Sequence, residues 1–285
     1  MKNLSSKWLL AFTMLAAVSF ISCGSDDDEV TPPEVEMEVE ADDTSKPSTL
    51  STGSSTTYIS YNDDGLVSQI KTEDGGFVQS LRYDYSQLES NHKIIVKRYT
   101  RRNGGEEYES ESWHEFDLED GRVVASRIVN GEDQTSSEGT YTYNEKGQLI
   151  SYKPQGGNEY RITWENYVIT DVETKYGDEE EWMSRIATLE YSKVKVGKYC
   201  GYFDLTMKDA VLVYEEEMGL LLNSMFGTKV KYFPSKMTID DHGMGIECTL
   251  KFNSKTDAVP SSTTGMGITH QITWMKAIKA KVKVK

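Results

Sequence analysis

The clearest structural signature in this chain reads Tyr61-Asn62-Asp63-Asp64-Gly65-Leu66-Val67. An aromatic residue, an Asn or Asp, two or three polar residues and a Gly precede a Val or Leu. The pattern returns twice, as Phe116-Asp117-Leu118-Glu119-Asp120-Gly121-Arg122-Val123 and Tyr143-Asn144-Glu145-Lys146-Gly147-Gln148-Leu149. It is typical of a strand, a tight turn whose Gly accepts a positive φ, and a return strand. The unequal spacing of the three copies argues against a strict propeller or solenoid period.

Alternating side chains extend this hairpin pattern over much of the chain. Tyr160, Ile162 and Trp164 alternate with polar residues, and residues 247–252 and 268–274 behave in the same way. Such alternation predicts antiparallel strands with one covered face and one wet face. The chain is therefore predicted to be mainly β.

One segment departs from the strand pattern. Thr206-Met207-Lys208-Asp209 has the form of a capping box, and apolar residues then recur at helical spacing, at Val211, Tyr214, Met218, Leu221, Leu222 and Met225. We predict one covering helix near 207–226, with Glu215, Glu216 and Glu217 mostly on its outer side and Gly227 at its end. Two strands with a turn near Gly219 are the alternative.

The N-terminus has the parts of an export signal. Lys2 and Lys7 supply the positive start, and an apolar stretch from Trp8 to Phe20 follows. Phe20-Ile21-Ser22-Cys23 then resembles a bacterial lipobox, with Phe in the place where Leu is usual. In a lipobox the cysteine is lipidated, so Cys23 is the predicted lipidation site. A secretory signal with an incidental cysteine is the alternative.

An acid-rich segment follows Cys23. Ser25, Asp26, Asp27, Asp28 and Glu29 resemble the acidic export tag of Bacteroidetes surface lipoproteins, although a solvated linker would have the same composition. Residues 24–45 carry ten acids and no base. Such a composition buries too little apolar surface to fold. The predicted organisation is a lipoprotein signal peptide over 1–22, a lipidated N-terminus and acidic disordered tether over 23–55, and a single β domain over 56–285.

Two later stretches sharpen the resemblance. Together with the tyrosine-rich hairpins and the leader, Leu222-Asn223-Ser224-Met225-Phe226-Gly227-Thr228-Lys229 and Phe233-Pro234-Ser235-Lys236-Met237-Thr238 resemble a family of Bacteroidetes lipoproteins of unknown function. The domain of this family is described as porin-like, and the resemblance covers roughly residues 56–275. It implies a strongly curved antiparallel sheet, open or half-barrel, and it supplies no catalytic or binding residues.

Charge and motifs exclude several functions. The net charge is −15, from 31 Lys+Arg against 46 Asp+Glu, which argues against a nucleic-acid partner. The histidines His92, His114, His242 and His270 are scattered, and Asp240-Asp241-His242 has no partner at a recognised zinc spacing. We therefore predict no catalytic residues, cofactor or metal site. Carboxylate pairs cannot be judged without coordinates, and Cys200 and Cys248 are either two buried thiols or a disulfide.

The aromatic residues offer the one candidate binding surface. Trp113, Trp164 and Trp182 could form a platform for sugars on the concave side of the sheet, or they could be ordinary sheet packing. The resulting prediction is a lipid-anchored outer-membrane protein, exposed on the cell surface, that binds a glycan or an envelope protein and is not an enzyme. The alternatives are an extracellular polymer hydrolase and a structural or assembly component of the envelope. The oligomeric state stays open.

Overall fold

The computed structural model describes residues 37–40, 45–131, 134–154, 157–177, 181–196, 215–241, 244–253, 259–265, 267–275 and 281–284. The chain divides into two compact units, Met1–Val35 and Glu36–Lys285. Every described residue belongs to the second unit, and the fold below is the fold of that unit.

Nineteen strands form one sheet in this described part of the chain. Their bounds are β1 Met37–Glu40, β2 Pro47–Ser51, β3 Ser55–Tyr61, β4 Val67–Asp74, β5 Phe77–Asp84, β6 Lys93–Arg102, β7 Tyr108–Glu119, β8 Arg122–Asn130, β9 Gln134–Tyr143, β10 Leu149–Lys153, β11 Glu159–Glu165, β12 Val168–Lys175, β13 Met183–Ser184, β14 Ile186–Lys195, β15 Tyr232–Asp241, β16 Met244–Lys251, β17 Ser262–Gly265, β18 Ile268–Trp274 and β19 Lys281–Val284. The described helical segments are α1 Leu88–Asn91, η3 Glu215–Glu217 and α2 Met218–Leu222.

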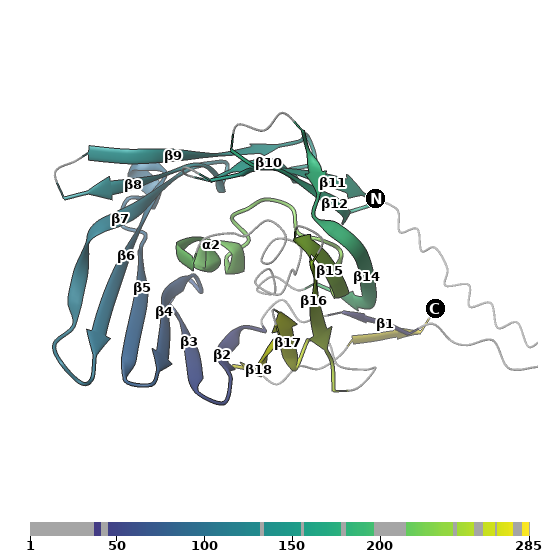
Figure 1. Cartoon of the computed structure of the whole chain (residues 1–285), viewed down its shortest axis with the longest axis horizontal. Coiled ribbons are helices and arrows are strands. Elements are labelled where there is room, and N and C mark those ends of the chain that lie inside the picture. Colours follow the sequence, from purple (N-terminus) through teal and green to yellow (C-terminus); the bar gives the residue numbers. More distant parts are fainter. Residues whose placement is uncertain are drawn as a thin grey trace, which may run out of the picture. The chain divides into compact units, whose positions relative to one another are not determined.

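The sheet is an antiparallel meander that bends back on itself. Strands β2 to β13 pair in sequence order, β14 to β18 do the same, and β18 pairs with β2 to join the two runs. The two ends of this strand order, near β12–β13 and at β14, lie close together. The Tyr191 hydroxyl on β14 donates to the Ile169 carbonyl on β12 at 2.7 Å. The sheet is therefore nearly closed, with α2 on its concave side (Figure 1). The predicted strongly curved antiparallel sheet is confirmed.

Alternation assigns the two faces of the sheet. Tyr160 and Ile162 on β11 are buried while Arg161 and Thr163 are exposed, as the sequence predicted. The same holds on β16, where Cys248 and Leu250 are buried. The inner face thus carries the core, and the outer face carries most of the charged residues. Since successive side chains point to opposite faces, a shift of one residue would exchange the two sets.

The two ends of the sheet differ. The repeated motif forms tight turns at residues 62–66, 120–121 and 144–148, and together with the turn at 166–167 they make up what we call the turn end. The side chain of Asn62 accepts from the Leu66 amide at 2.8 Å, and Gly65 has φ +80°. Asn144 and Gly147 repeat this geometry with φ +72° at the Gly, which confirms the predicted strand, turn and return strand. The opposite end, with residues 75–76, 103–107, 131 and 154, is called the loop end.

Aromatic side chains close the turn end. In four cases a Tyr hydroxyl or Trp indole near the end of one strand donates to a backbone carbonyl near the start of the strand that precedes it in the sheet, while Tyr191 on β14 reaches β12 and Trp274 on β18 reaches Pro260, just before β17. The contacts, which we call aromatic latches, are Tyr61 to Pro47 at 2.9 Å, Tyr85 to Val67 at 2.6 Å, Tyr143 to Val123 at 2.6 Å, Trp164 to Leu149 at 2.7 Å, Tyr191 to Ile169 at 2.7 Å and Trp274 to Pro260 at 3.0 Å. The latches explain why the aromatic residue before the turn is a Tyr in two of the three motif copies, Tyr61 and Tyr143.

The covering helix is shorter than predicted. Residues 207–214 lie outside the described residues, and η3 and α2 together end at Leu222 rather than at 226. The amide of Met225 donates to the Leu220 carbonyl at 3.0 Å, and that of Ser224 to the Leu221 carbonyl at 3.0 Å. This is a Schellman stop whose left-handed residue is Ser224, with φ +61°. Because that residue is not Gly, the end of the helix could not be recognised from the residue types. The alternative of two strands is wrong for residues 215–222.

The tether boundary also needs correction. Strand β2 lies within the range predicted as a disordered tether, and it pairs with both β3 and β18. Leu50 is 2% exposed and belongs to the core. Strand β1 likewise pairs with β14 and β19. The acidic composition of the segment as a whole concealed two short strands, of which β2 lies inside the sheet between β3 and β18.

Candidate functional site

The concave side of the sheet is occupied by residues 215–230, which we call the inner segment. Its three glutamates were predicted to lie mostly outward, and this is wrong for two of them, because Glu216 is 4% and Glu217 1% exposed. Only Glu215 is exposed. Burial of a carboxylate costs several kcal/mol unless it is hydrogen-bonded or paired. The partners of Glu216 and Glu217 therefore define the polar chemistry of the interior.

Glu217 is held by tyrosine hydroxyls. Tyr141 donates to Glu217 Oε1, and Tyr152 donates to Oε2 at 2.9 Å. Burial, followed by the negative charge of Glu217, raises the pKa of Tyr141 well above its usual value. The Tyr141 hydroxyl thus stays protonated and acts as a donor. A buried carboxylate is satisfied here by neutral donors from two neighbouring strands.

The same tyrosines begin a stack along the inner face. Tyr141 on β9 stacks on Tyr152 on β10 with ring centroids 5.0 Å apart, and Tyr152 stacks on Tyr160 on β11 at 5.8 Å. Offset stacks at these separations add to burial. We call the three rings the tyrosine ladder. Glu217 lies at one end of the ladder. At the other end, the guanidinium of Arg185 lies 6.0 Å from the Tyr160 ring.

Glu216 is paired with charge instead. Arg98 on β6 donates to Glu216 Oε1 through Nε at 3.1 Å and also through Nη2. His114 on β7 places Nε2 3.7 Å from the same oxygen. Burial lowers the pKa of His114, Glu216 raises it, and Arg98 lowers it further, so that the net shift is downward. The imidazole is thereby held in its neutral form at neutral pH.

Close backbone approach fixes where the inner segment lies. The Gly219 amide donates to the Tyr83 hydroxyl at 3.0 Å, and a Cβ at Gly219 would clash with the Tyr83 ring. Further along, the side chain of Asn223 accepts from the Val67 amide at 3.0 Å and donates to the Tyr85 hydroxyl at 2.9 Å. The segment is thus tied to several strands at the turn end.

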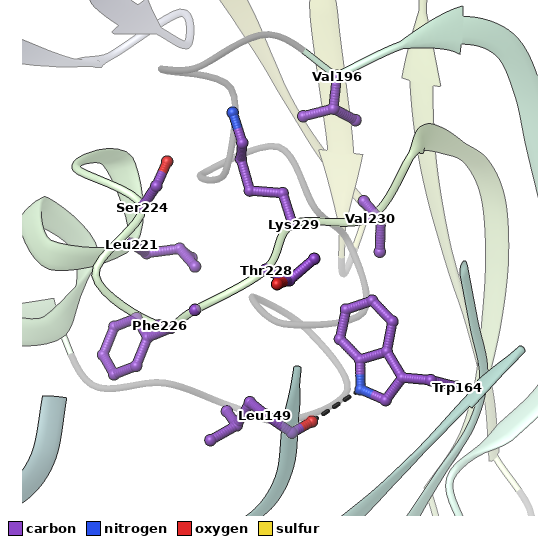
Figure 2. Close-up of a pocket in the computed structure, with 10 residues that line it drawn as sticks. Leu149, Trp164, Val196, Leu221, Ser224, Phe226, Thr228, Lys229 and Val230 are labelled. Atoms are coloured by element: carbon purple, nitrogen blue, oxygen red, sulfur yellow. Dashed lines mark hydrogen bonds between the residues drawn. The ribbon is translucent and has the colours of Figure 1, made fainter. Parts of the chain in front are cut away.

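Trp164 borders a small cavity beside the inner segment. Leu149, Leu221, Phe226 and Val230 are among the residues that surround it, and the Trp164 indole donates to the Leu149 carbonyl (Figure 2). Its volume is about 20 Å³, which is room for roughly one water molecule. This cavity is too small for a sugar, so Trp164 acts here in packing and as an aromatic latch.

The three predicted platform residues do not share one surface. Trp164 lies on the inner face. Trp113 lies on the outer face of β7, where its indole donates to Glu115 at 3.1 Å. Trp182 precedes β13 and covers the guanidinium of Arg161 at 4.0 Å, also on the outer face. The structure therefore assembles no platform from these three rings.

The remaining predicted residues are placed as follows. Cys23, the acidic tag from Ser25 to Glu29, Cys200 and His242 lie outside the described residues. Cys248 is buried, and a Cys200–Cys248 disulfide is not tested. His92 is exposed after α1, and His270 is half-buried on β18. Among the described residues, no group of three His, Cys, Asp or Glu side chains is arranged to hold a metal ion.

Ion pairs cover the outer face. Arg127 donates to both carboxylate oxygens of Asp117 at 2.8 and 2.9 Å. The Glu115 carboxylate accepts hydrogen bonds from Arg127 at 3.0 Å and from Lys93 at 2.7 Å. Further pairs join Arg82 to Glu107, Lys97 to Glu109, Arg161 to Glu173 and Lys236 to Glu247. These pairs span the sheet from β5 to β16, so the outer face is suited to water.

Several of these features escaped sequence reasoning. The tyrosine ladder, the pairing of Glu216 and the position of Arg185 each join residues from distant strands. Only the shared face of Tyr160 and Ile162 was visible in the alternation.

Within the described ranges, no helix has the length and apolar character needed to cross a membrane.

Comparison with known proteins shows a likeness in structure alone. No family model matches the sequence, and no curated protein matches it. Among solved structures, the chain is similar to a porin-like protein from Bacteroides uniformis, with a TM-score of 0.48 and 12% identity over 82% of this chain and 96% of that one. At this level of similarity neither a family nor a function can be transferred, so the functional conclusions below rest on the residues of this chain.

Proposed function

We propose that this chain is a lipid-anchored protein of the outer membrane, exposed at the cell surface, whose β domain stands in water and acts as a non-enzymatic binding module. The observation that carries the proposal is Phe20-Ile21-Ser22-Cys23 at the end of an apolar leader. A cysteine bearing several acyl chains gives stable attachment, which a single chain does not.

The outer face supports a domain in water. A charged residue facing lipid costs about 2–4 kcal/mol at the bilayer midplane for Arg or Lys. The network of Lys93, Glu115, Asp117 and Arg127 would therefore be unfavourable against acyl chains. Attachment through Cys23 requires no such contact, because the lipid alone enters the membrane.

The interior supports binding more than catalysis. A polymer hydrolase would need two carboxylates that face each other across an open cleft. Glu216 and Glu217 are buried and are held by Arg98 and by two tyrosines, respectively. Neither presents a free carboxylate to a polymer. The hydrolase alternative therefore draws no support from these two residues.

Fractionation tests the anchor. Detergent phase partition of cell lysates should place the wild-type protein in the detergent phase and Cys23→Ala in the aqueous phase. Cys248→Ala is the matched control, because it removes a buried thiol that carries no lipid, and it should partition like wild type. A Cys23→Ala variant that stays in the detergent phase would contradict lipidation at this residue.

Protease treatment of intact cells tests surface exposure. The wild-type protein should be cut without lysis, because an acid-rich segment such as residues 24–36 is expected to be accessible. Replacing Asp26, Asp27, Asp28 and Glu29 with Ala should keep the protein in the membrane fraction but protect it from external protease. Cutting of the wild type only after lysis would place it on the periplasmic side.

A further inference from the structure

We propose that Arg185 forms a binding site for an oxyanion group, carried either by a free anion or by an acidic sugar, at the loop end of the inner face. The inference deepens the binding role proposed above, on which it rests, by naming the chemistry of a ligand. It starts from the contacts of one residue.

The backbone of Arg185 is fixed between two strands. Its amide donates to the Val172 carbonyl on β12 at 2.7 Å, and its carbonyl accepts from the Asp240 amide on β15 at 2.9 Å. It connects β13 to β14 where the two margins of the nearly closed sheet meet. The side chain therefore starts from a constrained position, and only 6% of the residue is exposed.

Within the part of the chain that the structure describes, the guanidinium of Arg185 has no counter-charge. Its Nε is buried and has no hydrogen-bond partner. Among the described residues, no carboxylate forms an ion pair with it, whereas Arg98 has Glu216 and Arg127 has Asp117. Arg185 therefore differs from the other arginines that face buried or half-buried surroundings.

Electrostatics makes this arrangement costly. Arginine stays protonated in proteins, so Arg185 cannot avoid the cost by losing its charge. Burying an uncompensated charge is strongly unfavourable. The Tyr160 ring at 6.0 Å lies at the limit of cation–π range and offsets little of that cost. A bound oxyanion would supply the missing acceptors.

The surroundings favour a particular ligand class. A planar guanidinium matches carboxylate, sulfate or phosphate oxygens in a two-point contact. The neighbouring Tyr152 and Tyr160 rings are buried, at 0% and 3% exposure, so the guanidinium itself rather than a ring face would recognise the ligand. The adjoining Met183 and Ser184 are exposed, so the backbone of Arg185 lies next to the surface of the sheet.

Thermal unfolding of the detergent-solubilised full-length protein tests the site. Sodium sulfate and sodium glucuronate are compared with sodium chloride at equal ionic strength. Stabilisation of the wild type by glucuronate alone would identify an acidic sugar, and stabilisation by both would identify the oxyanion as sufficient. Arg185→Met should remove either response, and its unfolding temperature without anion should equal or exceed that of wild type, since the buried charge is gone.

Titration calorimetry measures the loss. Binding of the stabilising anion should weaken at least about 30-fold in Arg185→Met, as expected when one partner of a buried charge pair is removed. Arg185→Lys keeps the charge but loses the two-point contact, so it should fold and bind with intermediate affinity. Arg161→Met is the matched control. It removes an exposed guanidinium stacked on Trp182 and should respond to anions as wild type does.

The outcomes separate this inference from the broader function. An unchanged anion response in Arg185→Met, the absence of any anion-specific stabilisation in wild type, or strong destabilisation of Arg185→Met without anion would each overturn the site. A glycan screen that finds the same ligand for wild type and Arg185→Met would overturn the site and leave the binding role intact. A screen in which neither protein binds would overturn the binding role itself.

Discussion

The turn end and the loop end of the sheet are built from the same alternating strands, yet their side chains make different kinds of contact. At the turn end, aromatic latches tie the strands together, and the inner segment packs against them through Gly219, Asn223 and Gly227. Large apolar side chains are exposed at both ends, with Tyr108 at 56%, Met244 at 65% and Ile268 at 54% at the loop end, and Tyr167 at 48% and Met275 at 62% at the turn end. Polar contacts at the loop end are made by exposed pairs such as Lys97 with Glu109.

This difference assigns separate roles to the two ends. Buried hydrogen bonds contribute more to stability than exposed pairs, because a lost partner leaves a desolvated group behind. We infer that the turn end and the inner segment hold the fold together. The loop end can then vary or bind without unfolding the sheet, and Arg185 lies at that end.

The largest expected effect comes from filling a close approach at the turn end. Gly227 has φ +81°, and a Cβ there would clash with the Gly147 carbonyl and lie 2.9 Å from the Tyr143 ring. Gly227→Ala should lower the free energy of unfolding by about 4 kcal/mol, combining backbone strain with overpacking. Urea unfolding followed by tryptophan fluorescence measures it.

Gly104 at the loop end is the matched control for that change. It has φ +74°, but a Cβ there would meet no atom within 4 Å. Gly104→Ala should therefore cost only the backbone strain, about 1–2 kcal/mol. Equal losses at Gly227 and Gly104 would contradict the view that the turn end is the more tightly packed of the two.

The second effect concerns two glutamates that both accept a tyrosine hydroxyl. Glu217→Ala would leave the hydroxyls of Tyr141 and Tyr152 without their buried acceptor, and it should cost about 3 kcal/mol. Glu109→Ala at the loop end removes an exposed acceptor of Tyr99 and should change stability by less than about 0.5 kcal/mol. Thermal unfolding of the two variants beside wild type measures both, and a larger loss for Glu109→Ala would reverse the assignment of roles.

The turns and faces of the sheet were predictable because their signals are local. Asn62 and Gly65 reveal a turn through the conformations and hydrogen bonds they favour, and Tyr160 and Ile162 reveal a face through their spacing. Neither inference requires knowledge of a distant strand. The same local logic predicted a helical element near α2 but extended it too far, since a Ser takes the left-handed position that usually belongs to Gly.

The interior was not predictable for a different reason. A run of three glutamates is normally solvated, and nothing within residues 215–217 indicates that two of them are buried. The hydroxyls of Tyr141 and Tyr152 come from strands more than sixty residues away in sequence. Nothing in the sequence distinguishes Arg185 either. Its unusual property is that Nε lacks a hydrogen-bond partner, which only the three-dimensional structure reveals.

The smallest expected effect isolates one aromatic latch. Tyr143→Phe removes the hydroxyl that donates to the Val123 carbonyl at 2.6 Å but keeps the ring beside Arg122 and Gly227. The loss should be about 1–1.5 kcal/mol, the net worth of one hydrogen bond in a partly buried setting. Tyr99→Phe is the loop-end counterpart, because its hydroxyl donates to the exposed Glu109 at 2.7 Å, and water can replace that contact.

Urea unfolding of both variants measures how much each hydroxyl contributes to the free energy of unfolding. The dependence of that free energy on urea concentration is held to the wild-type value. The turn-end variant should be the less stable by about 1 kcal/mol. Hydrogen exchange adds a positional readout, because Tyr143→Phe should raise the exchange rate of amides near the start of β8, where the latch holds the strand, and Tyr99→Phe should not. If the two variants lose equal stability, and exchange near Val123 is unchanged, then ring packing rather than the hydroxyl closes the turn end, and the recurrence of Tyr before the turn needs another cause.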